Sequence, residues 1–96
     1  MKKFEYDSVR ILFKALLSLE NEAECEAFLE DLCTITEIKS MAQRLEVARL
    51  LNEKTVYTEI ARKTGASTAT ISRVGRSLNY GTDGYKLVIE RLSEEK

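Results

Sequence analysis

No proline interrupts this chain, and that absence constrains the fold more than any other feature of the sequence. Proline is the strongest helix breaker, so a stretch of 96 residues without it allows long helices. Only four glycines punctuate the chain. Apolar residues recur at helical spacing, and strand-like alternation is not sustained anywhere. The sequence therefore predicts an all-α fold of six helices, in a single domain of residues 1–96.

Two of the predicted helices carry more apolar surface than one short chain is expected to cover. The helix predicted for residues 7–19 has an apolar stripe with further apolar residues beside it: Val9, Ile11, Leu12, Phe13, Leu16, Leu17 and Leu19. In the helix predicted for residues 35–52, Met41, Leu45 and Ala48 point inward, while Val47 and Leu50 extend onto a neighbouring face. A helix that is apolar on more than one face is usually buried on more than one face, so we expect a second subunit to cover it.

Residues 55–79 have the pattern of a helix-turn-helix. Two short helices that cross steeply need a small residue where they approach, and Ala61 stands at that point. The turn between them needs a positive φ, which Gly65 adopts without steric cost. Ser67 can then cap the second helix by accepting a hydrogen bond from a free backbone N–H. The inward side of that helix is apolar: Ile71, Val74 and Leu78.

The outward side of the same helix suits a DNA groove. Its residues are small, hydroxyl-bearing or basic: Thr68, Ala69, Ser72, Arg73 and Arg76. Small side chains let a helix enter the major groove, and arginine can bind guanine through two hydrogen bonds. Ser67 adjoins this set, and Arg62 and Lys63 end the preceding helix, where backbone contacts are expected. Although the net charge of the chain is −1, residues 54–76 hold five bases and a single acid, so we expect double-stranded DNA as the partner.

The motif resembles the DNA-reading segment of the tryptophan repressor family. The residues that carry the resemblance are Gly65-Ala66, Ala69-Thr70-Ile71-Ser72-Arg73 and Ser77-Leu78, and it is greatest to the tryptophan-repressor-related branch of Gram-positive bacteria. The resemblance implies an intertwined homodimer, with residues 1–54 as a dimerisation core, 55–79 as the helix-turn-helix and 83–93 as a helix that completes the core. A two-fold dimer of this kind would read a near-palindromic operator, with its paired motifs about one DNA turn apart.

The resemblance also implies a place for a small effector. In the family a tryptophan lies between two arginines, near a threonine and a serine, and the matching positions are Thr34, Arg44, Arg73 and Ser77. Two departures argue against the same ligand. Val74 replaces a glycine and would crowd a flat ring, and Glu46 replaces an arginine. Tryptophan, another small effector and no effector all stay open, with no cofactor as the favoured expectation.

Other function classes find little support. The chain has no histidine, so a histidine-dependent catalytic site cannot be proposed, and an enzyme is not expected. Cys25 and Cys33 read as buried thiols in one helix, too far apart for a disulfide and too few for a metal site. The absence of a long apolar run favours a cytoplasmic protein with no membrane partner.

The main alternative is a protein-interaction module that binds another regulator or a polymerase. An interaction helix would present leucines or aromatic residues on its exposed face, whereas the helix after Gly65 presents hydroxyls and arginines. A transcriptional regulator is therefore the favoured expectation, and repression is inferred by analogy.

Overall fold

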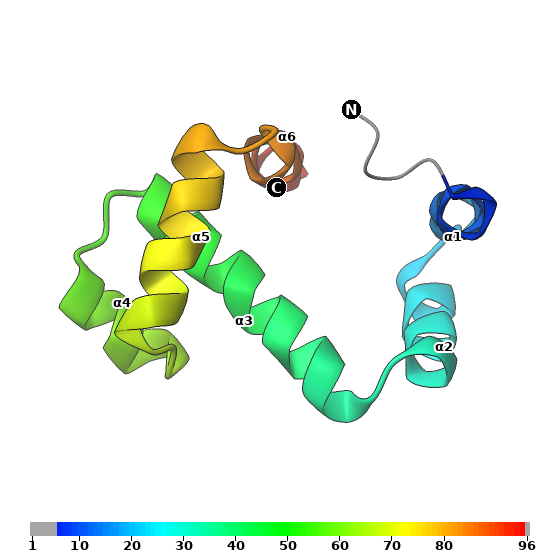
Figure 1. Ribbon diagram of the computed structural model, residues 1–96, viewed down its shortest axis with the longest axis horizontal. Helices are drawn as coiled ribbons and strands as arrows, with labels where there is room; N and C mark the ends of the chain where they lie inside the picture. Colours follow the sequence, from blue (N-terminus) through cyan, green and yellow to red (C-terminus); the bar gives the residue numbers. More distant parts are fainter. Residues whose placement is uncertain (1–5, 96) are drawn as a thin grey trace. The chain divides into compact units, whose positions relative to one another are not determined.

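A computed structural model describes residues 6–95 and confirms an all-α fold (Figure 1). Within this range there are six helices and no strand. The helices are α1 (Asp7–Leu17), α2 (Glu22–Leu32), α3 (Ile35–Asn52), α4 (Tyr57–Thr64), α5 (Thr68–Tyr80) and α6 (Gly84–Ser93). The chain divides into two units, residues 1–35 and 36–96, which are described separately below. No helix in the described range is long and apolar enough to cross a membrane.

The first unit contains α1 and α2 and buries little of its apolar surface. Neither helix has a buried residue, and Leu17 is 84% exposed. Helix α1 ends two residues earlier than predicted, and the hydroxyl of Ser18, which follows the helix, donates to the Ala15 carbonyl at 2.6 Å. The thiols of Cys25 and Cys33 are free and only partly buried, so the prediction that both are buried is wrong. Much of the apolar surface of this unit is left uncovered.

The second unit holds the core, which lies between α3, α4 and α5. The residues that form it are Val47, Ala48, Leu50, Ile60, Ala66, Ile71 and Val74. The prediction for α3 was partly wrong, since Val47 and Leu50 are buried whereas Met41 is 40% exposed. Figure 1 shows the physical reason: α4 and α5 lie beside the carboxyl-terminal half of α3 and leave its earlier turns uncovered. Tyr85 and Ile89 of α6 pack against the same core.

Helix α3 ends in a Schellman motif. The Thr55 N–H donates to the Leu50 carbonyl and the Lys54 N–H donates to the Leu51 carbonyl, both at 3.0 Å. These are the paired bonds that satisfy the last carbonyls of a helix and turn the chain away from its axis. Lys54 occupies the left-handed position of the motif, with φ of 68°. The motif directs the chain from α3 into α4.

A short turn joins α5 to α6. Helix α5 continues through Tyr80, one residue beyond the predicted end of the helix-turn-helix, and α6 begins at Gly84 after Asp83, which has φ of 66°. The N–H of Gly81 makes the last helical bond, to the Ser77 carbonyl at 2.9 Å, and α5 ends there because the Gly81 backbone, with φ of −88° and ψ of −147°, leaves the helical conformation. A Cβ at Gly81 would lie 2.3 Å from that carbonyl oxygen, so no other residue fits this turn.

Candidate nucleic-acid interface

The turn between α4 and α5 is held by a compact set of hydrogen bonds. Gly65 has the expected left-handed backbone, with φ of 74°, and its N–H donates to the Ala61 carbonyl at 2.9 Å. The Thr64 hydroxyl donates to the Ile60 carbonyl at 2.8 Å and accepts from the Ala66 N–H at 3.1 Å. Gln43 of α3 donates to the Thr64 carbonyl at 3.1 Å and ties the turn to the core. The two helices of the motif are therefore fixed relative to each other.

Ser67 caps α5 as the sequence predicts. Its hydroxyl oxygen accepts from the Thr70 N–H at 3.1 Å, and its hydroxyl lies 3.1 Å from the Thr70 hydroxyl oxygen. This cap satisfies one of the free N–H groups at the start of the helix that would enter a groove. Ser67 is exposed, although its hydroxyl is already engaged with both the N–H and the hydroxyl of Thr70.

Helix α5 has two clearly different faces. Ile71, Val74 and Leu78 are buried, each at most 5% exposed. The opposite face presents the predicted recognition residues: Thr68, Ala69, Arg73 and Arg76 are exposed, and Ser72 is partly buried. The face offered to solvent therefore carries hydroxyls, a methyl group and two guanidinium groups, with no acid on this helix. Whether each of these residues contacts DNA stays a prediction.

Arg62 and Lys63, predicted to contact the DNA backbone, are exposed but not free. Both pair with Glu59 one turn earlier in α4, and Lys63 Nζ lies 3.9 Å from Glu59 Oε2. The hydrogen bond from Arg62 is the main cause that lowers the pKa of the Glu59 carboxyl, and it raises the pKa of Arg62 in turn. A phosphate would have to compete with this carboxylate for both cations.

Three of the four predicted effector residues line one hollow. Arg44 from α3, Arg73 and Ser77 from α5 and Tyr85 from α6 surround about 330 Å³. Val74 lines it too, as expected for a residue that crowds the space. The fourth residue, Thr34, belongs to the other unit, so its part in a pocket stays a prediction. The guanidinium groups of Arg44 and Arg73 give this hollow a positive character.

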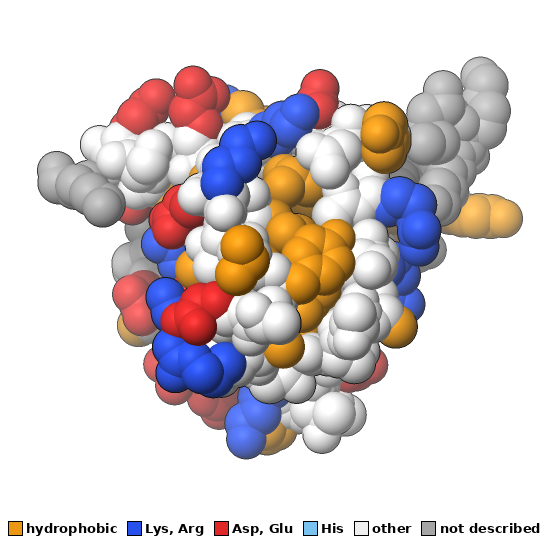
Figure 2. All heavy atoms as spheres, turned by 90° about the vertical axis from the view of Figure 1, so that its left-hand side faces the viewer, with side chains coloured by type: hydrophobic (Ala, Val, Ile, Leu, Met, Phe, Trp, Pro, Cys, Tyr) orange, Lys and Arg blue, Asp and Glu red, His pale blue; other side chains and the backbone are white. Residues whose placement is uncertain are grey.

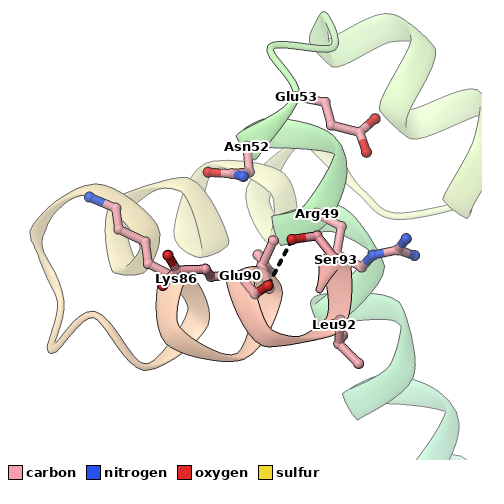
Figure 3. Close-up of a pocket in the computed structure, with 8 residues that line it drawn as sticks. Arg49, Asn52, Glu53, Lys86, Glu90, Leu92 and Ser93 are labelled. Carbon is pink, nitrogen blue, oxygen red and sulfur yellow. Dashed lines mark hydrogen bonds between the residues drawn. The ribbon is translucent and has the colours of Figure 1, made fainter. Parts of the chain in front are cut away.

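The remaining basic side chains are unevenly distributed. The face that includes α4 carries both basic and acidic side chains around a central group of hydrophobic ones (Figure 2). A different hollow, of about 530 Å³, lies between the end of α3 and α6 (Figure 3). There Arg49 and Lys86 are accompanied by Glu53 and Glu90, and these carboxylates would repel phosphate. The hollow at α6 is therefore a poorer match for DNA than the exposed face of α5, a helix that carries no acid.

Comparison with known proteins assigns the chain to a family. The sequence profile described as Trp repressor protein matches residues 7–93, which is most of the chain. The chain belongs to the Trp repressor family. This membership confirms the resemblance found in the sequence. The Trp repressor family consists of DNA-binding regulators rather than enzymes, and α4 and α5 form the helix-turn-helix expected of such a regulator.

Relatives in the Trp repressor family are similar to this chain in both sequence and structure. The uncharacterized protein YerC of Bacillus subtilis is 58% identical over 83 residues, covering 86% of this chain and 80% of YerC. The crystal structure of a TrpR-like protein from Eubacterium eligens superposes with a TM-score of 0.93 at 57% identity, over 97% of this chain and 96% of that one. A candidate Trp repressor from Staphylococcus aureus gives a TM-score of 0.92 at 46% identity, over 96% and 92% of the two chains. The six-helix Trp-repressor-like fold is thereby confirmed.

The structure also places two residues beside the helix-turn-helix that were not predicted from the sequence. Lys54 and Tyr57 line a hollow beside α5 together with Arg76. The backbone conformation of Lys54 cannot be read from the sequence, because glycine usually occupies that position of a Schellman motif. The only available signal was that Lys54 begins the basic stretch of residues 54–76.

Proposed function

We propose that this protein is a sequence-specific DNA-binding transcriptional regulator that reads the major groove with α5. Repression is the favoured mode of action, since a reading motif without an activation domain can block a promoter by occupying it. The regulator would act in the cytoplasm, on chromosomal DNA. Residues 1–54 would provide the dimerisation core, 55–79 the reading motif and 83–93 a helix that completes the core.

The observation that carries the proposal is the division of α5 into a core face and a groove face. Its apolar residues are buried against α3 and α4, so the helix cannot rotate and must present Thr68, Ala69, Arg73 and Arg76 outward. Ala69 and Thr68 leave room for a close approach to base edges, and Arg73 has the reach and the paired donors to recognise guanine. Arg76, one turn later, lies where a phosphate contact is expected.

A homodimer is proposed because the first unit does not bury its own apolar residues. Helices α1 and α2 have no buried residue, and Ile11, Leu17 and Leu32 are each more than half exposed. Exposed apolar side chains of this kind are covered in oligomers, and most soluble oligomers are two-fold symmetric. Two copies related by such an axis would present two α5 helices to the two half-sites of a near-palindromic operator.

The proposal is tested by selection from a library of random duplexes, followed by titration of the enriched sequence at several salt concentrations. We expect enrichment of a near-palindrome whose half-sites are one helical turn apart. The logarithm of the affinity should fall linearly with the logarithm of the salt concentration, because bound phosphates release counterions. Sedimentation at micromolar concentration should give twice the chain mass.

The competing function is a protein-interaction module, and the same experiments separate the two. A module that binds another regulator would enrich no duplex, and its association with that partner would depend less steeply on salt. A monomer in sedimentation would contradict the homodimer but not DNA binding by a single motif. The exposed hydroxyl and guanidinium groups of α5 favour the regulator, because an interaction helix would present apolar anchors there.

A further inference from the structure

A second group of polar side chains flanks α5 on the side of α4. They surround a hollow of about 400 Å³, called here the Lys54–Arg76 hollow. Lys54 follows α3, Tyr57 begins α4, and Ser72, Arg76 and Asn79 come from α5. No acid is found among the described residues that line it. Three separate segments of the chain therefore direct donors to one place.

The two cations of this hollow have no acidic partner. Within residues 6–95, neither Lys54 nor Arg76 forms an ion pair, and both are exposed. Elsewhere in the second unit, Arg49, Lys63 and Lys86 each lie within 4 Å of a carboxylate. The positive charge of the Lys54–Arg76 hollow is therefore available to an anion from outside the chain.

Lys54 is held in this position at a conformational cost. It has φ of 68° at the Schellman position of α3, where glycine is preferred because side chains disfavour the left-handed region. Such backbone outliers often mark functional sites. A lysine here places an ammonium group beside α5, which a glycine could not do.

We propose that the Lys54–Arg76 hollow binds a phosphate of the DNA backbone at the edge of the groove that α5 reads. This inference rests on the proposed function and adds a backbone contact to it. A helix lying in the major groove has a phosphate strand along each flank, and Lys54 and Arg76 lie on one flank of α5. Lysine supplies a point charge and arginine a fork of donors, while the hydroxyl of Tyr57 is a further donor for phosphate oxygens.

The test is Lys54→Gly, measured with Lys54→Arg and Lys86→Gln as matched variants. Lys54→Gly relaxes the backbone, so the protein should be as stable as the wild type or more stable. Its affinity for the selected duplex should fall about tenfold at about 50 mM salt, and the salt slope should become shallower by about one unit. Lys54→Arg should keep both values. Lys86→Gln removes a lysine from the acid-lined hollow at α6 and should change neither.

The outcomes separate this inference from the proposed function. If the wild type binds DNA and Lys54→Gly keeps its affinity and salt slope, the phosphate contact is overturned while the regulator stands. If the wild type binds no duplex, the proposed function itself fails. A further experiment titrates the protein with inorganic phosphate and follows binding by tyrosine fluorescence. Saturable binding of the free ion at low millimolar concentration, lost in Lys54→Gly while the affinity and salt slope for DNA stay unchanged, would assign the hollow to a small anion and overturn the DNA contact.

Discussion

The Nε atom of Arg62 donates a hydrogen bond to Glu59 Oε1 at 3.1 Å, and a second hydrogen bond joins Arg62 Nη2 to Glu59 Oε2. This two-point contact on the exposed surface of α4 holds a carboxylate beside two cations that are proposed to contact DNA. Surface ion pairs contribute little to stability. The pair therefore matters more for the charge seen by DNA than for the fold.

Replacing Glu59 by glutamine should strengthen DNA binding. The Arg62 hydrogen bond lowers the pKa of Glu59, so the carboxylate stays ionised at neutral pH and opposes phosphate. Glu59→Gln removes that charge and releases Arg62 and Lys63 for the backbone. We expect an affinity several-fold higher at low salt, a steeper salt slope and an almost unchanged melting temperature. Weaker binding in this variant would show that Glu59 positions Arg62 for its contact.

Arg73 and Arg76 should have separable effects on binding. Arg76→Ala should weaken binding to specific and random duplexes alike, because a phosphate contact carries no sequence information. Arg73→Ala, and Ser72→Ala with it, should reduce discrimination at particular base pairs by about 1–3 kcal/mol. Competition between the selected operator and random DNA measures the difference. Equal losses on both duplexes for all three variants would refute the division between base and backbone contacts.

Ser67 offers a way to separate stability from binding. Ser67→Ala removes the cap on the Thr70 N–H and should lower the free energy of unfolding by about 1 kcal/mol. Ser67→Asp supplies another cap and should keep stability, but its carboxylate at the start of α5 should repel phosphate. Denaturant unfolding and duplex titration should therefore rank the two variants in opposite orders. The same ranking in both measurements would show that Ser67 acts only through the fold.

Two glycines of the motif should respond to alanine with opposite signs. Gly65→Ala places a side chain at φ of 74° and should lower the free energy of unfolding by about 1 kcal/mol, although no atom lies within 4 Å of the new Cβ. Gly75→Ala lies inside α5, where its Cβ would contact the Tyr57 hydroxyl at 3.5 Å and Leu51 Cδ1 at 3.6 Å. These are ordinary contacts, so helix propensity should raise stability by about 0.5–1 kcal/mol. Urea unfolding of both variants checks the signs.

Tryptophan should not act as an effector of this protein. Val74 and Tyr85 line the hollow between Arg44 and Arg73 and limit the space for an indole ring. Millimolar L-tryptophan should therefore leave both the melting temperature and the operator affinity unchanged, since a ligand stabilises only the state that it binds. A rise of several degrees accompanied by tighter operator binding would show that the ring fits despite Val74.

The helix-turn-helix could be predicted from the sequence because its requirements are local. Ala61, Gly65 and Ser67 each satisfy a condition set by residues within one or two turns of them, and the structure confirms the turn and the cap. The buried part of α3 could not be predicted in the same way. Met41 and Val47 are both apolar, and only the position of α4 and α5 along α3 determines which is covered.

The two groups of polar residues around α5 differ in how far the sequence could predict them. The outward face of α5 follows from its periodicity, whereas the Lys54–Arg76 hollow assembles side chains from three segments and depends on the backbone conformation of Lys54. The Glu59 pairing had a visible signal, since an acid three and four residues before two bases on a helix is a common ion-pair spacing.

The lack of buried residues in α1 and α2 has a consequence for how stable protein accumulates. Burial of the core within residues 36–96 therefore does not cover the apolar residues of these two helices. In an isolated chain those residues stay exposed to water, where proteases and chaperones can bind them. If a second copy covers them, the amount of stable protein should rise faster than in proportion to the chain concentration, because dimer formation depends on the square of that concentration.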